Sequence, residues 1–363
     1  MARPRPAPEL MDELVEEVLI RCPPDDPGRL VRAALVCKPW CRVVSGAGFR
    51  RRYRQFHGSP PVLGFFYRMK DATRFMPTAS FRPSYASFLK DWPAIDARHG
   101  RILFDDYDSL SMGIHFVVSN SITGDGSSRL PTPRPFLNIC GWNAALLCAE
   151  AVCDHLECPG GPFRVVFMAT DSSMKLTSAC VYLSEACTWS VTISVEHPIG
   201  NVAKAKGGCR TLVVGNAAYF LLAPSCAGVL EYDVDKQLLS VISLPSVCEK
   251  GLPALINAED GGLGFCTLWG LKFYMWSRQA GPNGLEWAQH RVIDLKSLLP
   301  DRPVPGYMPS VIAFADSVHL MLWAACTGVF DIHLKSGRLT ELAEIRDYFH
   351  TIVPYTCFYT PRY

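Results

Sequence analysis

The sequence has no long apolar run and carries almost no net charge. No uninterrupted apolar stretch reaches the roughly 18 residues that a membrane-spanning helix needs, and the strongest candidate, 312–334, is broken by Asp316, His319 and Asp331. The 36 Lys and Arg residues nearly balance the 34 Asp and Glu residues, for a net charge of +2. Such a balance gives no general attraction for nucleic acid or for an anionic membrane. We therefore expect neither of them among the partners.

Recognisable targeting and catalytic motifs are also missing. The N-terminal stretch 1–8 has no apolar centre of the kind that secretory signals contain. No Gly-x-Ser-x-Gly elbow occurs, and the Gly-rich segment 260–264 lacks the Lys and Ser/Thr of a phosphate-binding loop. The 15 cysteines are odd in number and irregular in spacing, which favours thiols over a disulfide framework. We expect a soluble protein of a reducing intracellular compartment, cytoplasmic or nuclear.

One group of metal-ligand residue types stands close together in the chain. Cys148, Cys153, His155 and Cys158 fall within eleven residues. Four residues separate the successive cysteines, at the loose end of the spacing found in structural zinc sites. We interpret the group as half-buried cysteines in an insertion loop, and we expect neither a metal nor a cofactor.

The first sixty residues have a helical pattern. Leu10, Leu14, Val15, Val18 and Leu19 form an apolar stripe at helical spacing before Pro23 and Pro24. Leu30, Val31, Ala34 and Leu35 form a second stripe, and a basic run at 50–54 has the pattern of a solvated helix face. A unit of about 45 residues lies near the lower limit for independent stability. Some of its apolar surface must therefore be covered by the rest of the chain or by a partner.

From residue 58 onward the pattern changes to short apolar runs between turn residues. The stretch 215–239 aligns without a gap with 315–339, and a third copy lies between them. Repeats of roughly 45–55 residues are typical of propeller blades. The sequence predicts a multidomain α+β protein with a flexible tail at 1–7, an all-α unit of three to four short helices at 8–57, and an all-β propeller of about six blades at 58–363. We suspect that 62–67 or a last strand near 352–359 closes the ring.

Several side chains of the predicted propeller have two interpretations. Asp233, Asp294 and Asp331 recur at strand ends, where acids either ring a channel or, as we favour, accept hydrogen bonds from the following turn. Five tryptophans could stack on a ligand, but at strand positions they are more typical of the core between blades. They are Trp189, Trp269, Trp276, Trp287 and Trp323.

Specific segments resemble a known family. The segment 10–19, then Pro23-Pro24-Asp25-Asp26, then Leu30 to Trp40 with its Val-Cys-Lys-x-Trp core, resembles an F-box. The segments 48–53, 60–66, 96–101, 142–144, 153–156, 161–167 and 259–265 look like the continuation seen in a large group of grass F-box proteins. The resemblance covers nearly the whole chain. It departs from the family at Met11, where a proline is usual, and at Cys41, where an arginine is usual.

The resemblance implies a non-catalytic substrate receptor of a Skp-cullin-F-box ubiquitin ligase. The F-box would bind the Skp-type adaptor and, through it, the cullin and RING subunits, and the propeller would bind an unknown protein client. The residues that we predict to contact the adaptor are Leu10, Met11, Leu14, Val15, Leu30, Val31, Ala34, Val36, Cys37, Lys38 and Trp40. The alternatives are a ligand-binding, lectin-like or enzymatic propeller with a helical appendage, and a decayed F-box homologue.

Overall fold

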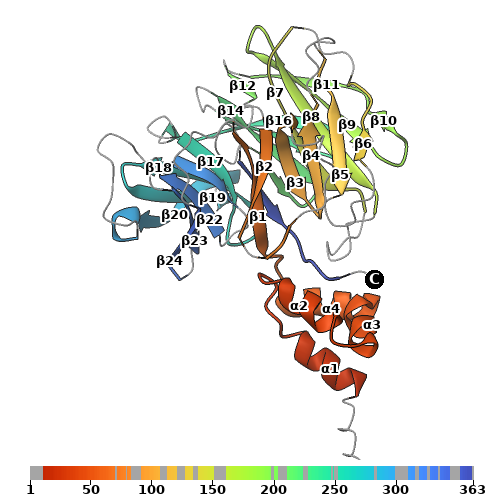
Figure 1. Ribbon diagram of the computed structural model, residues 1–363. Helices are drawn as coiled ribbons and strands as arrows, with labels where there is room; N and C mark the ends of the chain where they lie inside the picture. Colours follow the sequence, from red (N-terminus) through yellow and green to blue (C-terminus); the bar gives the residue numbers. More distant parts are fainter. Residues whose placement is uncertain are drawn as a thin grey trace, which may run out of the picture.

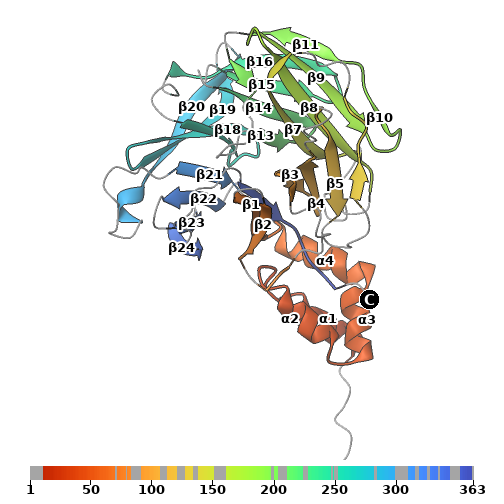
Figure 2. The ribbon, with the colours of Figure 1, turned by 45° about the horizontal axis from the view of Figure 1, so that its top comes forward.

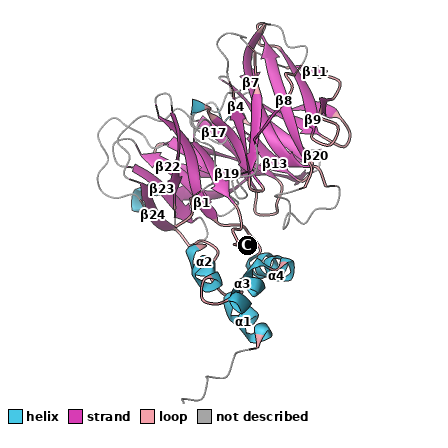
Figure 3. Cartoon of the chain, turned by 45° about the vertical axis from the view of Figure 1, so that its right-hand side comes forward, coloured by secondary structure: helices cyan, strands magenta, loops and turns pink. Residues whose placement is uncertain are grey.

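A computed structural model gives the fold of the chain. It describes residues 11–69, 72–78, 80–82, 91–106, 113–120, 127–133, 138–150, 161–197, 200–202, 211–223, 228–246, 248, 252–281, 284–298, 310–314, 319–324, 328–333, 336–343 and 352–361. Figure 1 shows four helices at the N-terminal end and, apart from them, a large assembly of strands. The same separation of helix from strand is visible from the side in Figure 3. None of the helices in these ranges is long and apolar enough to cross a membrane.

Four short helices form the N-terminal module. They are α1 (Asp12–Leu19), α2 (Gly28–Ala34), α3 (Lys38–Ser45) and α4 (Ala47–His57). Pro23 and Pro24 follow α1, and Pro39 occupies the first turn of α3, where its missing N–H leaves no bond unmade. Gly58, with φ of 72°, ends α4. Proline and glycine thus set the boundaries of the helices, and the apolar residues between them supply one common core.

All the strands pair with antiparallel neighbours. The first sheet contains β1 (Val62–Met69), β2 (Ala72–Pro77) and β25 (Ile352–Thr356), and the second contains β3 (Ala94–Arg98), β4 (Arg101–Asp105), β5 (Phe116–Asn120) and β6 (Ser127–Arg129). The third contains β7 (Ile139–Cys148), β8 (Phe163–Asp171), β9 (Leu176–Leu183), β10 (Thr188–Trp189) and β11 (Ile193–Glu196). The fourth contains β12 (Asn201–Val202), β13 (Thr211–Val214), β14 (Ala217–Ala223), β15 (Gly228–Asp233) and β16 (Leu238–Ser243).

Two further sheets complete the β-rich part. The fifth contains β17 (Leu252–Asn257), β18 (Leu263–Trp269), β19 (Lys272–Gly281) and β20 (Gly284–Asp294), followed by the 3-10 turn η4 (Leu295–Ser297). The sixth contains β21 (Ser310–Phe314), β22 (His319–Ala324), β23 (Gly328–His333) and β24 (Arg338–Ala343). Figure 2 shows the sheets arranged one after another around the β-rich part.

The sheets form a β-propeller. Each contributes one strand to a closed cycle of contacts, in the order β25, β3, β7, β13, β17, β21 and back to β25. The predicted propeller architecture is therefore confirmed. The predicted number of about six blades is not confirmed, because within the described ranges only five of the sheets have the four or more strands of a full blade, and the sheet of β1, β2 and β25 has three.

The repeat in the sequence corresponds to repeated strands. β15 starts at Gly228 and β23 at Gly328, and each is the third strand of a meander that continues into β16 or β24. Phe220 and Leu222 of β14 face the same core as Leu230 and Tyr232 of β15. The alternation of apolar residues that revealed the repeat is thus the alternation of buried positions along each strand.

The two ends of the chain share one sheet. β25 pairs with β1, with Tyr67 opposite Ile352 and Val62 opposite Thr356. This pairing confirms that the last strand near 352–359 completes a sheet begun at the other end. Phe66, Phe75 and Tyr355 form a cluster of aromatic rings within it, at centroid distances of 4.9 to 6.2 Å.

Candidate interaction surface

The apolar residues of helix α1 lie on two adjacent faces, one buried and one exposed. Val15 and Leu19 are only 2% and 4% exposed and belong to the core of the module. Leu14 and Val18, about 100° from them around the helix, are 48% and 62% exposed, and Met11 before the helix is 63% exposed. A surface helix normally directs its apolar stripe toward the core. Among the described residues, packing within the chain therefore leaves the exposed part of this stripe uncovered.

The turn between α2 and α3 adds a second exposed apolar segment. Leu35 is 70% exposed and Val36 is 64% exposed, and the next two residues, Cys37 and Lys38, are also exposed. Helix α3 contacts both α1 and α2. We call the five exposed apolar residues of these two segments the docking face: Met11, Leu14, Val18, Leu35 and Val36.

The structure sorts the predicted adaptor-contact residues into three groups. Val15, Leu30 and Ala34 are 2%, 0% and 4% exposed, so we correct their assignment from contact residues to core residues. Val31 and Trp40 are half-buried. The exposed members are Met11, Leu14, Val36, Cys37 and Lys38, and Leu10 lies outside the described residues. Val18 and Leu35 were missing from the prediction and are among the most exposed apolar residues described.

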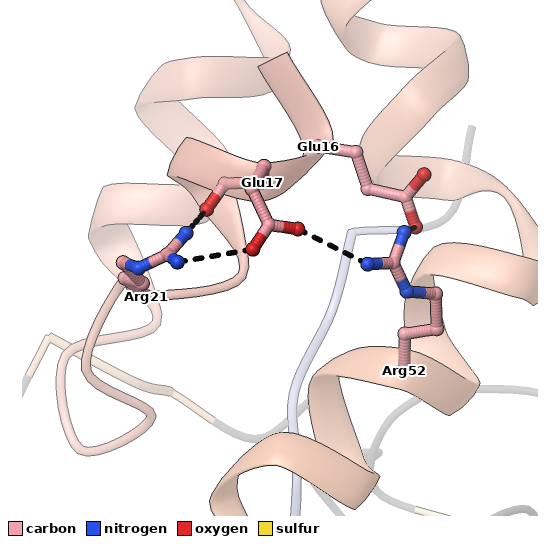
Figure 4. Close-up of polar contacts among 4 residues, drawn as sticks. All are labelled: Glu16, Glu17, Arg21 and Arg52. Atoms are coloured by element: carbon pink, nitrogen blue, oxygen red, sulfur yellow. Dashed lines mark hydrogen bonds and ion pairs between the residues drawn. The ribbon is translucent and has the colours of Figure 1, made fainter. Parts of the chain in front are cut away.

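Ion pairs hold α1 against α4, as Figure 4 shows. The Arg52 guanidinium on α4 lies 3.0 Å from Glu16 Oε1 and 3.1 Å from Glu17 Oε2, both on α1. Arg21 completes the network by donating to the Glu17 carboxylate at 3.0 Å and to its backbone oxygen. Arg54, in the same basic run, is only 4% exposed. The run is therefore part of the packing between helices as well as a solvated face.

The core of the module is built around Tyr53. Its hydroxyl donates to the backbone oxygen of Cys22 at 2.9 Å, and its ring stacks on Phe49 at 5.7 Å. Burial is the main cause that raises the pKa of Tyr53 above its usual range, with smaller contributions from Cys22 and Asp25. A further ring, that of Phe358 from the C-terminal segment, makes an edge-to-face contact with Tyr53, with the ring centroids 6.2 Å apart. A residue near the end of the chain thus belongs to the N-terminal core.

The recurring acids of the propeller act within turns. Asp233 Oδ1 accepts from the amides of Asp235 and Lys236, at 3.1 and 3.0 Å, and Asp294 accepts from the amide of Lys296 at 3.0 Å. The favoured interpretation, turn stabilisation, is confirmed at these two positions. The Lys236 ammonium and amide groups lower the pKa of Asp233, against a small effect of burial.

Three of the tryptophans pack between sheets. Trp189 lies against the core of the second and third sheets, and Trp276 and Trp287 lie against the core of the fourth and fifth sheets. Trp276 stacks on Phe265 with centroids 5.7 Å apart and planes at 6°. Trp269 is 54% exposed, so the interpretation as core is wrong for that residue. The side chain of Trp323 lies outside the described part.

A group of polar and aromatic side chains lies on facing parts of the fourth and fifth sheets. Tyr219 donates to Glu231 Oε1 at 2.8 Å, and Ser240 donates to Glu231 Oε2 at 3.1 Å. Burial and the contact with Glu231 raise the pKa of Tyr219. The Trp276 indole N–H is buried and has no hydrogen-bond partner among the described residues. We call these four residues the Glu231 group.

Three of the four members of the cysteine–histidine group, Cys153, His155 and Cys158, lie outside the described residues. Cys148, the fourth, is half-buried at the end of β7. Within the described ranges, no three His, Cys, Asp or Glu side chains come together as metal ligands would. The expectation for that group therefore stays a prediction.

Comparisons with known proteins give structural likeness alone. No protein-family model matches the chain, and no curated protein matches it. The α-L-arabinanase of Penicillium chrysogenum with arabinobiose is 12% identical, with a TM-score of 0.39, over 78% of this chain and 85% of that one. A GH93 α-L-arabinofuranosidase of Fusarium graminearum with arabinobiose is 13% identical, with a TM-score of 0.41, over 81% and 85%. Apo AztD of Citrobacter koseri is 10% identical, with a TM-score of 0.36, over 81% and 97%.

These likenesses correct one expectation. We expected a non-catalytic chain, but the solved structures that it resembles include an arabinanase and an arabinofuranosidase, which are enzymes. The expectation of a non-catalytic chain is therefore withdrawn. At 12% and 13% identity, the likeness concerns the fold and carries no substrate over to this chain.

Proposed function

We propose that the chain is a two-part binding protein. Its helical module docks onto a Skp-type adaptor of a cullin–RING ubiquitin ligase, and its propeller binds the protein that the ligase modifies. The observation that carries the proposal is the docking face, with five large apolar side chains that are 48% to 70% exposed on one small helical module.

The energy of solvation supports a protein partner for this face. Burying a Leu, Val or Met side chain fully is worth about 1.5–3 kcal/mol. The described core of the module uses Val15, Leu19, Leu30 and Val44, which are 0% to 4% exposed, and the docking face contributes little to it. Met11, Leu14 and Val18 lie at helical spacing along one side of α1, and exposed apolar residues grouped in this way are typical of protein–protein contact sites.

The resemblance to an F-box supports the choice of adaptor. Both segments of the docking face lie in stretches that carry the resemblance, 10–19 and 30–40. Cys37 and Lys38 are exposed directly after Val36, so the Val-Cys-Lys part of the F-box-like core is open to solvent. Lys38 would add a charged contact at the rim, where such contacts set orientation more than affinity.

The test is a calorimetric titration of the full chain with a purified Skp-type adaptor of a grass. Leu14→Asp places a charge on the docking face and is expected to abolish binding at micromolar concentration, because an unpaired charge would be desolvated on docking. Leu285→Asp is the matched control, because Leu285 is 59% exposed but lies on β20 of the propeller. Equal binding of both variants would refute the proposal, as would no binding by the unaltered chain.

A second candidate function, a propeller that binds or converts a small polar ligand, is favoured by the Glu231 group. A carboxylate, two hydroxyls and the buried indole N–H of Trp276 lie on neighbouring sheets there. A few convergent polar groups beside aromatic rings are typical of sites for small molecules. The two functions are compatible, because they use different parts of the chain.

This candidate is tested by the melting temperature of the full chain with a panel of mono- and oligosaccharides. A ligand of this group is expected to raise the melting temperature of the unaltered chain but not that of Glu231→Gln. Asp294→Asn, which alters a turn carboxylate elsewhere on the propeller, is the control and is expected to keep the response. An equal shift in all three proteins would place the ligand elsewhere.

A further inference from the structure

The C-terminal segment 352–361 belongs to two parts of the molecule at once. Its first half is β25, which closes the propeller against β1. Beyond the strand, the amide of Cys357 donates to the backbone oxygen of Pro61 at 3.2 Å, so the segment continues alongside the link between α4 and β1. Figures 1 and 2 show it running from the strands to the helices. Tyr355, Cys357, Phe358 and Thr360 are only 0% to 6% exposed.

Phe358 is the point where this segment enters the helical module. It is 6% exposed and packs in the same core as Val15, Leu19 and Val44. Its ring makes an edge-to-face contact with the ring of Tyr53, and the Tyr53 hydroxyl in turn donates to the backbone oxygen of Cys22, just after α1. The side chain therefore supports both α4 and the inner face of α1.

The orientation of α1 decides where the α1 part of the docking face, Met11, Leu14 and Val18, points. Val15 and Leu19 face inward on the same eight-residue helix on which Leu14 and Val18 face outward. A helix of this length is not stable alone in water, so its position depends on the core beneath it. Loss of packing around Val15 and Leu19 is therefore expected to change the positions of Leu14 and Val18.

A second contact fixes the module relative to the propeller. Ser80, after β2, donates to Asp26 Oδ1 at 3.1 Å and accepts from the amide of Gly28 at 3.2 Å. A Cβ at Gly28 would stand 2.7 Å from Ser80 Oγ, so a side chain at this position would displace the Ser80 hydroxyl. The segment before α2 is thereby held against the propeller, independently of the C-terminal segment.

We propose that Phe358 is a positioning residue for the docking face: it makes closure of the propeller by β25 a condition for adaptor docking. The proposal rests on the proposed function, because it concerns the same docking face. It adds a means of controlling adaptor binding to the proposed function. If the C-terminal strand loosened, Phe358 would leave the core of the module and α1 would be free to move.

The test uses the full chain, with adaptor titration and hydrogen exchange of the α1 amides. In Phe358→Ala, we expect adaptor binding to weaken about tenfold or more and the α1 amides to exchange about tenfold faster, while the amides of β8 keep their rates. Phe358→Leu keeps most of the side-chain volume and is expected to restore binding to within about threefold of the unaltered chain. Phe56→Ala is the control, because Phe56 lies on α4 and is 56% exposed; it should change neither readout.

The results for the Phe358 variants either support or overturn the positioning role of Phe358. Unchanged α1 exchange and unchanged binding in Phe358→Ala would overturn the proposal. If Phe358→Ala does not fold, Phe358→Val, which removes less of the side chain, takes its place: weaker binding with an unchanged propeller melting temperature supports the proposal, and unchanged binding overturns it. If the unaltered chain does not bind the adaptor, the proposed function fails, and α1 exchange alone then decides whether Phe358 positions the docking face.

Discussion

Replacing Leu35 by Ala is expected to weaken adaptor binding and to leave folding almost unchanged. Leu35 is 70% exposed, so little of its side chain contributes to the core. Burying a whole Leu side chain is worth about 1.5–3 kcal/mol. Allowing for the part already covered and for the methyl group that Ala keeps, we expect a loss of about 1–2 kcal/mol of binding free energy, or about 5- to 30-fold in Kd.

Leu30→Ala is the matched control for this prediction. Leu30 is 0% exposed and lies on α2, five residues before Leu35. The same truncation there is expected to cost about 2–5 kcal/mol of unfolding free energy, because it leaves a cavity. Adaptor titration and urea unfolding of both variants separate the two effects.

The reasoning would be refuted by the reverse pattern. If Leu35→Ala unfolds at lower urea and still binds the adaptor within twofold of the unaltered chain, Leu35 belongs to the core and not to the docking face. The unfolding transition of the helical module can be followed separately by hydrogen exchange, since the propeller has its own core clusters.

Three further predictions follow from single residues. Met11→Pro is expected to stabilise the module by about 0.4–1 kcal/mol in urea unfolding, because Met11 has φ of −64°, the value that proline imposes; a lower midpoint would contradict this. Cys37 should react with iodoacetamide at pH 8 while Cys180 does not, because Cys37 is exposed and burial raises the pKa of Cys180 to about 12; equal labelling by mass spectrometry would contradict it. Asp233 has a lowered pKa in the folded state, so its contribution to stability is present above its unfolded pKa and is lost as the pH falls through the folded pKa. Asp233→Asn should therefore flatten the acid side of the stability curve, and an unchanged curve would refute that.

The propeller was readable from the sequence because its pattern repeats. Alternation along strands such as β15 and β23 recurs at a fixed offset, and each copy supports the others. A strand such as β7 gives a weaker signal, because it is buried over Ala144–Leu147 and so reads as a continuous apolar run without alternation. A prediction of the number of strands in each sheet therefore depends on strands whose sequence pattern is weak.

The residues of the docking face could be predicted only in part from the sequence. Leu14 and Val15 are neighbours in one apolar stripe of the sequence, yet 48% and 2% exposed in the structure. On so short a helix, periodicity shows that apolar residues cover a wide arc but not which part of the arc faces the core. The packing of Phe358 against Tyr53 could not be foreseen either, because the two residues are remote in sequence and no local pattern links them.

The position of Phe358 has a consequence for protein synthesis. Chains leave the ribosome from the N-terminus, so the helical module emerges before the propeller, and domains usually fold in that order. Here Phe358, a part of the core of the helical module, is synthesised after β25 and so after the strands of every described sheet. A nascent chain that has not reached Phe358 would therefore carry α1 to α4 without the ring that completes their core. The module would reach its full packing only after the propeller strands have been synthesised.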